Sequence, residues 1–296
     1  DLFGKKNAGE INSVRKIGVY IGVPGLGDLL FIMPLFRALK NHFTGAEVVF
    51  IGKLLHAYSK PVFDTCPYID RLLEYHFYED MSAGAFSRFV RTLRAERFDL
   101  LVDTQRKFMP SLLMALGGAK FMVSYSSKGV FSDFEVDVPD RSSRHTSDIS
   151  LDLARAVGIT NPGTHLEISI PGDNLRYAEE FYASSGVAPG DRIAGMIPGA
   201  GHFSRQWDSA KFGRLCDRLY AEIGARVVFF GSIKDKPVID ECIAGMESPA
   251  IVEDFDRKSI LDSAALMSKC NVIVGVDSGP LHVADASGAP CVGIYG

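Results

Sequence analysis

The segment best suited to bind an anion lies near the end of the chain, where the apolar run Val272–Val276 leads into Asp277-Ser-Gly-Pro-Leu-His282. Five β-branched or small residues predict a buried strand, and the Asp-Ser pair that follows is typical of a helix start. The unpaired amides at a helix N-terminus attract anions such as phosphate, and Gly279 lets the backbone approach a bound group. The turn is therefore a candidate phosphate site, although a plain capped helix explains the same residues.

A second loop that suits a diphosphate follows the apolar run Ile193–Ile197. It reads Pro198-Gly-Ala-Gly-His-Phe-Ser-Arg-Gln-Trp207 and offers glycines, the hydroxyl of Ser204 and the guanidinium of Arg205. The alternative is a glycine-rich connector whose tryptophan packs on the core. Further along, Asp235 follows another apolar strand, where an acid would either take ribose hydroxyls or begin the next helix.

One carboxylate is placed to act as a base. Asp28 comes directly after Pro24-Gly-Leu-Gly27, at the end of the first predicted strand, and we expect the next helix to begin with it. This turn matches neither the GxGxxG fingerprint nor a P-loop. The helix dipole stabilises an acid at this place, so Asp28 is either a structural cap or a general base directed at a bound hydroxyl.

Basic and polar residues at two further places favour an anionic second substrate. One group, Asp103-Thr-Gln-Arg-Lys107, follows the predicted strand Phe98–Val102, and the pair Arg144-His145 precedes a predicted helix. Solvated loops have the same composition. As part of a binding site, these residues would form a polar and basic wall for an anion, to which Lys128 would add a further charge.

Short apolar strands alternate with helices through both halves of the chain, which predicts parallel sheets covered on both faces. In the first half we expect strands at 16–23, 48–51, 71–74, 98–102 and 121–124, and helices at 28–42, 54–63, 82–96, 110–116 and 147–157. In the second half we expect strands at 193–197, 226–230, 250–252, 272–276 and 291–294, and helices at 175–184, 209–223, 236–245, 259–267 and 280–286.

Breaker-rich stretches at Thr160–Thr164 and Val187–Gly190 predict a boundary between two doubly wound domains, 1–170 and 171–296. The candidate residues above then come at the carboxyl ends of strands, where open α/β sheets bind ligands, and we expect the two sheets to face a central cleft. A covering helix normally follows a strand such as Cys291–Ile294, so we also expect the C-terminal end to be incomplete and one sheet face to be bare.

The composition excludes several classes of protein. A net charge of -4 argues against general nucleic-acid binding, and no apolar stretch is long enough to span a membrane. We therefore expect a cytoplasmic protein. The five cysteines include no CxxC pair and are odd in number, which favours buried reduced thiols over a zinc site or a disulfide framework.

Four segments together resemble glycosyltransferase family 9, the ADP-heptose:lipopolysaccharide heptosyltransferases. They are Gly25-Leu-Gly-Asp-Leu-Leu30 with Pro34, Phe98–Gln105, Pro198-Gly-Ala200 through Trp207, and Asp277–His282 with Gly288-Ala-Pro290 and Tyr295-Gly296. The resemblance covers nearly the whole chain, and its first and last segments are the most specific. It implies a GT-B architecture, in which the first Rossmann-like domain binds the acceptor and the second binds the nucleotide-sugar donor. It also implies inversion at the anomeric carbon by direct displacement, without an obligatory metal or cofactor.

The resemblance and the strand-end positions together assign the candidate residues. Asp28 is expected to be the catalytic base. Donor-binding residues are expected to be Ser204, Arg205, Gln206, Asp235, Asp277, Ser278, Gly279 and His282. Acceptor-binding residues are expected to be Gly27, Gln105, Arg106, Arg144 and His145. The chain departs from the family at Gln206, where a lysine usually precedes the tryptophan, and Arg205 would have to supply that charge from a different angle.

The predicted function is transfer of a heptose, or a related sugar, from a nucleotide sugar to a lipopolysaccharide inner-core hydroxyl, with ADP-heptose as the expected donor. Such an acceptor implies peripheral contact with the inner face of the cytoplasmic membrane. Two alternatives remain open. One is a nucleotide-sugar-binding protein without transfer activity, as Gln206 suggests, and the other is a sugar-nucleotide epimerase with a similar fold.

Overall fold

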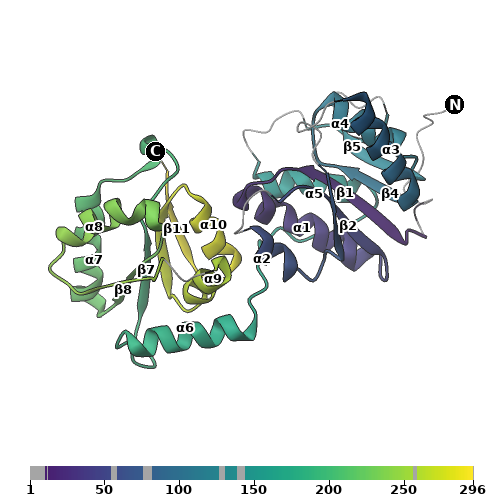
Figure 1. The fold of residues 1–296 in the computed structure, drawn as a ribbon. Helices are drawn as coiled ribbons and strands as arrows, with labels where there is room; N and C mark the ends of the chain where they lie inside the picture. Colours follow the sequence, from purple (N-terminus) through teal and green to yellow (C-terminus); the bar gives the residue numbers. More distant parts are fainter. Residues whose placement is uncertain are drawn as a thin grey trace. The chain divides into compact units, whose positions relative to one another are not determined.

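A computed structural model describes residues 11, 13–54, 59–75, 82–126, 131–138, 144–255 and 259–295 of the chain (Figure 1). The chain divides into two compact units. The first unit comprises residues 1–59 and 66–166, and the second comprises residues 60–65 and 167–296. The division therefore falls four residues before the predicted boundary, and the short segment 60–65 groups with the second unit.

The first unit is a parallel six-stranded sheet with the order β3-β2-β1-β4-β5-β6. Its strands are β1 (Lys16–Gly22), β2 (Glu47–Gly52), β3 (Arg71–Glu74), β4 (Leu100–Asp103), β5 (Phe121–Tyr125) and β6 (Phe134–Val136). The helices are α1 (Leu26–His42), α2 (Ser59–Asp64), α3 (Ala83–Glu96), α4 (Phe108–Leu116) and α5 (Thr146–Ala156), of which α2 lies almost entirely in the segment that groups with the second unit. The strand order changes direction between β1 and β4, which is where Rossmann-like sheets bind ligands.

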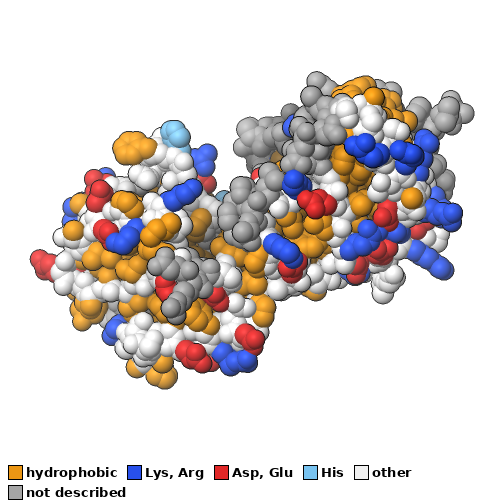
Figure 2. All heavy atoms as spheres, viewed as in Figure 1, with side chains coloured by type: hydrophobic (Ala, Val, Ile, Leu, Met, Phe, Trp, Pro, Cys, Tyr) orange, Lys and Arg blue, Asp and Glu red, His pale blue; other side chains and the backbone are white. Residues whose placement is uncertain are grey.

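The core of the first unit follows from its sequence pattern. The strands are nearly continuous apolar runs, so both faces of the sheet must be covered. Helix α1 packs against α5, and α3 packs against α4. The inward side of α3, with Phe89, Val90 and Leu93, joins Leu113 and Met114 of α4 in one buried cluster. On the outer surface, Lys and Arg side chains gather over α3 (Figure 2).

The second unit repeats the arrangement with a parallel five-stranded sheet of order β11-β10-β7-β8-β9. Its strands are β7 (Ile193–Ile197), β8 (Arg226–Phe229), β9 (Ala250–Val252), β10 (Val272–Val276) and β11 (Cys291–Ile294). Its helices are α6 (Gly172–Ser184), α7 (Ser209–Ile223), α8 (Lys236–Ala244), α9 (Ile260–Ser268) and α10 (Gly279–Ala286), with short 3-10 turns at Phe203–Arg205 and Ile233–Asp235. Here the order changes direction between β7 and β10.

The predicted elements differ from the structure at a few places. Helix α1 begins at Leu26, so Asp28 lies inside its first turn and not at its start, and α6 begins three residues earlier than expected. Strand β6 was not predicted, because its three residues make a recognisable strand only by pairing with β5. On the edge strand β11, Val292 is exposed. All five cysteines are free.

Candidate active site

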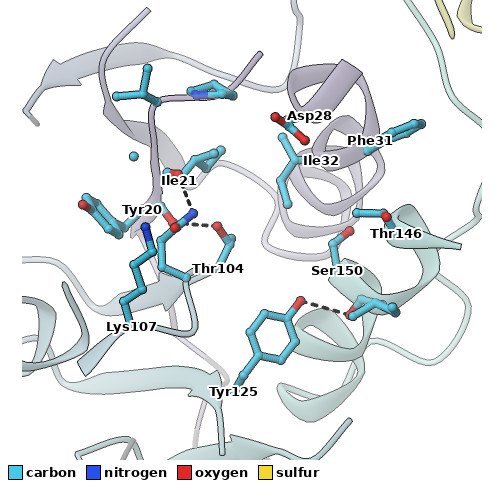
Figure 3. A pocket seen from close by; sticks show the side chains of 15 residues that line it. Tyr20, Ile21, Asp28, Phe31, Ile32, Thr104, Lys107, Tyr125, Thr146 and Ser150 are labelled. Carbon is cyan, nitrogen blue, oxygen red and sulfur yellow. Dashed lines mark hydrogen bonds between the residues drawn. The ribbon is translucent and has the colours of Figure 1, made fainter. Parts of the chain in front are cut away.

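A cavity of about 380 Å³ opens at the carboxyl edge of the first sheet, at the place where its strand order changes direction (Figure 3). Its walls come from the turn after β1, the start of α1, the turn after β4, the end of β5 and the start of α5. Apolar and aromatic side chains alternate with hydroxyl and amide groups around it. Such a lining suits a sugar, which presents both apolar ring faces and hydroxyls.

Asp28 lines this cavity and also caps α1. Its Oδ2 accepts a hydrogen bond of 3.2 Å from the backbone N–H of Gly25, one residue before the helix. The side chain is exposed, and among the described residues no hydrogen bond engages its Oδ1. The two interpretations of Asp28 are therefore compatible, because one oxygen can hold the helix start while the other faces a ligand.

Gln105 also lines the cavity, as do Thr104 and Lys107 of the same predicted polar wall, and a tightly bonded turn positions it. Its side-chain Nε2 donates to the carbonyl of Ile21 at 2.6 Å, and Thr104 Oγ1 donates to the carbonyl of Tyr20 at 2.9 Å. These bonds join the turn after β4 to strand β1. With Nε2 engaged, the amide oxygen Oε1 is the group that can accept from a ligand hydroxyl.

A buried acid, for which the sequence predicted no separate role, stabilises this turn through hydrogen bonds. Asp103 is fully buried at the end of β4, where its Oδ1 accepts from the backbone N–H of Gln105 at 2.8 Å. Its Oδ2 accepts from Ser111 Oγ at 2.5 Å. Burial disfavours the charged carboxylate and raises the pKa of Asp103 to about 7.

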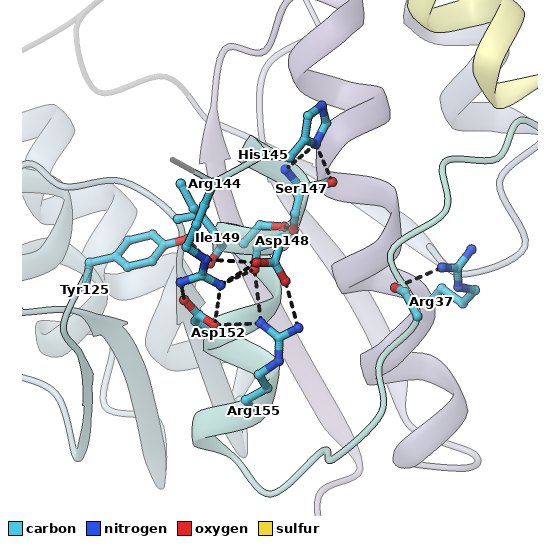
Figure 4. A network of polar contacts seen from close by, with 11 residues as sticks. Arg37, Tyr125, Arg144, His145, Ser147, Asp148, Ile149, Asp152 and Arg155 are labelled. Atoms are coloured by element: carbon cyan, nitrogen blue, oxygen red, sulfur yellow. Dashed lines mark hydrogen bonds and ion pairs between the residues drawn. The ribbon is translucent and has the colours of Figure 1, made fainter. Parts of the chain in front are cut away.

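The predicted basic wall is less cationic than its composition suggested. Arg144 Nη1 bonds Asp152 Oδ2 and its Nη2 bonds Asp148 Oδ2, both at 2.6 Å, and Arg155 completes the network (Figure 4). Hydrogen bonds from Arg155 and Arg144 lower the pKa of Asp148. The charge of Arg144 is thus balanced by two carboxylates on α5, and Arg144 is not among the residues that line the cavity.

The remaining acceptor candidates lie close to the cavity without lining it. The guanidinium of Arg106 stacks over the ring of Tyr125, with 4.5 Å from its carbon to the ring centre. His145 caps α5 through Nδ1 and packs edge-on against Phe31, with the ring centres 4.9 Å apart. Gly27 lies in the first turn of α1. Lys128 is outside the described residues.

Several lining residues were not predicted as site residues. They include Tyr20, Phe31, Ile32, Tyr125, Thr146 and Ser150, whereas Thr104 and Lys107 belong to the predicted polar wall. Thr146 and Ser150 lie four residues apart and so share one side of α5, and that spacing is visible in the sequence. Tyr125 is the last residue of β5, and Gln105 follows the end of β4 by two residues. The hydroxyl of Tyr125 donates to the carbonyl of Ile149 at 3.1 Å.

In the second unit the two predicted phosphate-binding loops, after β7 and after β10, lie next to each other. Arg205, in the loop after β7, lies 3.3 Å from Asp277, which follows β10. Both side chains are partly exposed, at 56% and 34%. The pair spans the point where the strand order changes direction, and it places a guanidinium beside the start of α10.

The N-terminus of α10 has the features of an anion site. Ser278 precedes the helix but does not cap it with its side chain, and its buried Oγ has no hydrogen-bond partner among the described residues. An added Cβ at Gly279 would meet no described atom within 4 Å, so the approach to the backbone is open. The dipole of α10 favours an anion here. His282 lies half-buried one turn further on.

The other donor candidates surround the same edge of the second sheet. Asp235 accepts from the backbone and hydroxyl of Ser232 at 2.8 and 2.7 Å, so it does stabilise its own turn. It also lies so close to Gly199 that a Cβ there would collide with it. Ser204 Oγ contacts His202 Nδ1 at 2.8 Å. Gln206 is exposed, and the ring of Trp207 packs on Phe212 as expected for a core tryptophan.

The described part of the chain contains neither a cluster of metal ligands nor a membrane-spanning helix. No group of three or more His, Cys, Asp or Glu side chains is arranged to hold a metal ion there. Within the same residues, no helix is both long and apolar enough to cross a membrane.

Comparisons with known proteins agree with the motifs. A model of the family described as glycosyltransferase family 9 (heptosyltransferase) matches residues 86–296. Lipopolysaccharide heptosyltransferase 3 of Escherichia coli K12 is 25% identical over 281 residues, which cover 91% of this chain and 79% of that protein. The crystal structure of a family 9 glycosyl transferase from Veillonella parvula has a TM-score of 0.79 at 24% identity, covering 96% of this chain and 82% of the other. Escherichia coli heptosyltransferase WaaC, solved with ADP-2-deoxy-2-fluoro heptose, has a TM-score of 0.69 at 15% identity, with coverages of 95% and 89%. These structural matches confirm the predicted fold class.

Proposed function

Since this chain belongs to glycosyltransferase family 9, as its motifs predicted, and is a glycosyltransferase, we propose that it transfers a heptose from ADP-heptose to a hydroxyl of a lipopolysaccharide inner-core acceptor. The names of its relatives, and the ADP-heptose analogue bound to one similar structure, support this choice of substrates. The observation that carries the proposal is the position of Asp28 in the cavity of the first unit.

In the proposed reaction, Asp28 takes the proton of the acceptor hydroxyl while that oxygen attacks the anomeric carbon of the donor. The bond from the anomeric carbon to the diphosphate oxygen breaks, ADP departs, and the configuration inverts. A sugar hydroxyl is a weak acid, so it needs a carboxylate within hydrogen-bond reach to be deprotonated. Asp28 Oδ1 suits this role because the bond to Gly25 uses only Oδ2.

We assign acceptor binding to the first unit. Gln105 would orient an acceptor hydroxyl through its amide oxygen, and Lys107, which also lines the cavity, would face an anionic group. Arg106 and His145 would contribute by holding the cavity walls, since they pack against Tyr125 and Phe31. The same indirect role is proposed for Gly27, which lies in the first turn of α1, and for Arg144, which precedes α5 and bonds two of its carboxylates.

We assign donor binding to the second unit. The amides at the start of α10 and the hydroxyl of Ser278 would bind the diphosphate, with Arg205 neutralising the charge of the leaving group. Asp235 would accept from the ribose hydroxyls. The further donor contacts proposed are Ser204, Gln206, Asp277, Gly279 and His282. The reaction needs no metal in this scheme, because the helix dipole and the guanidinium supply the positive charge.

The decisive test is Asp28→Asn, assayed for transfer and for ADP-heptose binding. We expect transfer to fall roughly 10²- to 10⁴-fold, the usual contribution of a general base. We expect donor binding to stay within about twofold, because the proposed donor site is in the other unit and the Asn oxygen can still accept from Gly25.

Asp262→Asn is a matched control. Asp262 Oδ2 accepts from the backbone N–H of Ser259 at 2.8 Å, so it caps α9 as Asp28 caps α1, but it lies in the second unit. Comparable losses of transfer in the two variants would mean that Asp28 acts only as a cap. Product analysis in the presence and absence of acceptor separates transfer from epimerisation, which needs the nucleotide sugar alone.

A further inference from the structure

Glu253 is a buried acid at the carboxyl edge of the second sheet. It is the first residue after β9, and only 3% of it is exposed. Its backbone N–H donates to the carbonyl of Phe229 at 3.1 Å, which continues the pairing of β9 with β8 by one residue. Burial of a carboxylate is costly unless its oxygens accept hydrogen bonds, so the partners of Glu253 show what it holds in place.

Each carboxylate oxygen of Glu253 accepts from a different element. Oε1 accepts from the backbone N–H of Gly231 at 3.0 Å, and Oε2 accepts from the hydroxyl of Ser263, also at 3.0 Å. Gly231 lies in the turn that follows β8, whereas Ser263 is buried in α9. Glu253 therefore ties the turn after β8 to a helix of the core.

The same turn carries Asp235, the acid proposed to accept from the ribose hydroxyls. Its Oδ2 accepts from the backbone N–H and the hydroxyl of Ser232, the residue that follows Gly231. Its Oδ1 faces the loop after β7, where a Cβ added at Gly199 would lie 2.2 Å from it. Asp235 is half-buried, and among the described residues no hydrogen bond engages Oδ1. That oxygen can therefore accept from a ligand.

We propose that Glu253 is a positioning residue for the donor, which fixes the turn after β8 so that Asp235 Oδ1 meets the ribose hydroxyls. A displacement of Gly231 would pass to Ser232 and from there to Asp235, because these residues form one bonded turn. Glu253 acts through Asp235 and not by contact with the donor, since both of its oxygens are bonded within the protein. This role rests on the proposed function, because it requires a nucleotide donor in the second unit.

The test is calorimetry of the whole protein with ADP and with 2′,3′-dideoxy-ADP, which lacks both ribose hydroxyls. We expect the wild type to bind ADP roughly tenfold more tightly, the effect of about one charge-assisted hydrogen bond. Glu253→Ala should reduce this ratio of affinities to about twofold, while the affinity for the dideoxy nucleotide stays within about twofold of the wild-type value. Glu253→Gln should retain the ratio, because its amide can accept from Gly231 and donate to Ser263.

Ser263→Ala keeps the test valid where Glu253→Ala does not fold. It removes only the hydroxyl that is bonded to Oε2 of Glu253 and leaves the acid in place. Because the acid is then held less firmly, the ratio should fall by roughly threefold. An unchanged ratio in this variant would count against the positioning role.

The matched control is Asp217→Ala. Asp217 Oδ1 accepts from the backbone N–H and the hydroxyl of Ser248 at 2.8 and 2.7 Å, so it also ties down a loop of the second unit. That loop precedes β9 and lies at the opposite edge of the sheet, so this variant should keep the wild-type ratio. Asp235→Ala should lower the ratio as Glu253→Ala does, and the two substitutions combined should lower it no further.

Equal losses of affinity for both nucleotides in Glu253→Ala would mean that this residue only stabilises the second unit, and would overturn the positioning role. An unchanged ratio in Glu253→Ala, or additive losses with Asp235→Ala, would do the same. Equal binding of both nucleotides by the wild type would reject the ribose contact and this role together, whereas loss of transfer in Asp28→Asn would still support the proposed function. Failure of the wild type to bind ADP at all would reject the proposed function as well.

Discussion

Two acids occupy matching places in the two sheets and have opposite environments. Asp103 ends β4, the fourth strand of the first unit, and Asp277 follows β10, the fourth strand of the second. Asp103 is fully buried and bonded to Ser111 and the backbone of Gln105. Asp277 is 34% exposed and paired with Arg205.

The difference shows how one strand order can serve two substrates. In the first unit the acid is buried, where it fixes a turn, and the ligand would meet mainly neutral groups together with Asp28 and Lys107 in the cavity. In the second unit the acid and its cation lie at the surface beside a helix N-terminus. A proton transfer needs one well-positioned carboxylate, whereas a diphosphate needs positive charge that it can reach.

The largest expected effect concerns Asp103. Its pKa is about 7 in the folded chain, above the ordinary value of 3.8 that holds in the unfolded chain, so the folded state holds the proton more tightly. The contribution of Asp103 to the free energy of unfolding is at its full value below about pH 4 and is lost as the pH rises to about 7. The two limits differ by about 4 kcal/mol. Asp103→Asn should therefore gain stability relative to the wild type between pH 5 and pH 8, measured by urea unfolding at the two pH values.

Asp99→Asn provides a control of opposite sign. Although partial burial acts to raise it, the hydrogen bonds from Lys120 and from the backbone of Arg15 lower the pKa of Asp99 below its usual value. A lowered pKa gives stability above the unfolded value that is lost on acidification, so this variant should lose stability relative to the wild type as the pH rises from 2 to 5, and the deficit should close again on acidification. If the stability of Asp103→Asn relative to the wild type did not change between pH 5 and pH 8, Asp103 would be ionised at little cost, and its contrast with Asp277 would disappear.

A smaller effect is expected at the exposed pair of the second unit. Arg205→Gln removes a charge-assisted contact to the diphosphate, worth about 1.5–3 kcal/mol, so ADP affinity should fall by roughly 10- to 100-fold. The stability of the free protein should change by less than about 1 kcal/mol, because exposed ion pairs contribute little. Calorimetry with ADP and thermal unfolding without it measure the two quantities.

The control for this variant is Arg218→Gln, which also breaks an exposed ion pair of the second unit, with Glu222. It should leave ADP affinity unchanged. Equal affinities of the wild type and Arg205→Gln for ADP would mean that Arg205 does not replace the lysine that the family usually has at the position of Gln206.

The sequence predicted the sheets well and the cavity only in part. Strands such as Val272–Val276 were predictable because both faces are buried and the apolar run is continuous. Asp28 and Gln105 were predictable as cavity residues because each follows a strand at the carboxyl edge of the sheet. Tyr125 and Ser150 were missed because they meet the cavity only through the packing of β5 and α5, which no local pattern encodes.

The balance of charge on the acceptor side was not foreseen, and the role of Arg144 stays a prediction. Arg144 was predicted to contact an anion, but Asp148 and Asp152 follow it at four and eight residues, and the structure pairs all three. That spacing was visible in the sequence, so the charge of Arg144 has to be considered together with the acids in the first turns of the helix that follows it. Burial of Asp103 was harder to foresee, because an acid after a strand is as often solvated.

The smallest expected effect tests whether Arg144 contacts the acceptor. Arg144→Gln should raise the acceptor KM by less than about threefold, since its charge is already balanced and the network is partly exposed. Gln105→Ala should raise the same KM by roughly tenfold, the cost of about one hydrogen bond, because it removes a group that lines the cavity. Steady-state kinetics with saturating donor compare the two. If Arg144→Gln had the larger effect, the network would have to open when the acceptor binds, and the first unit would use surface charge as the second is proposed to do.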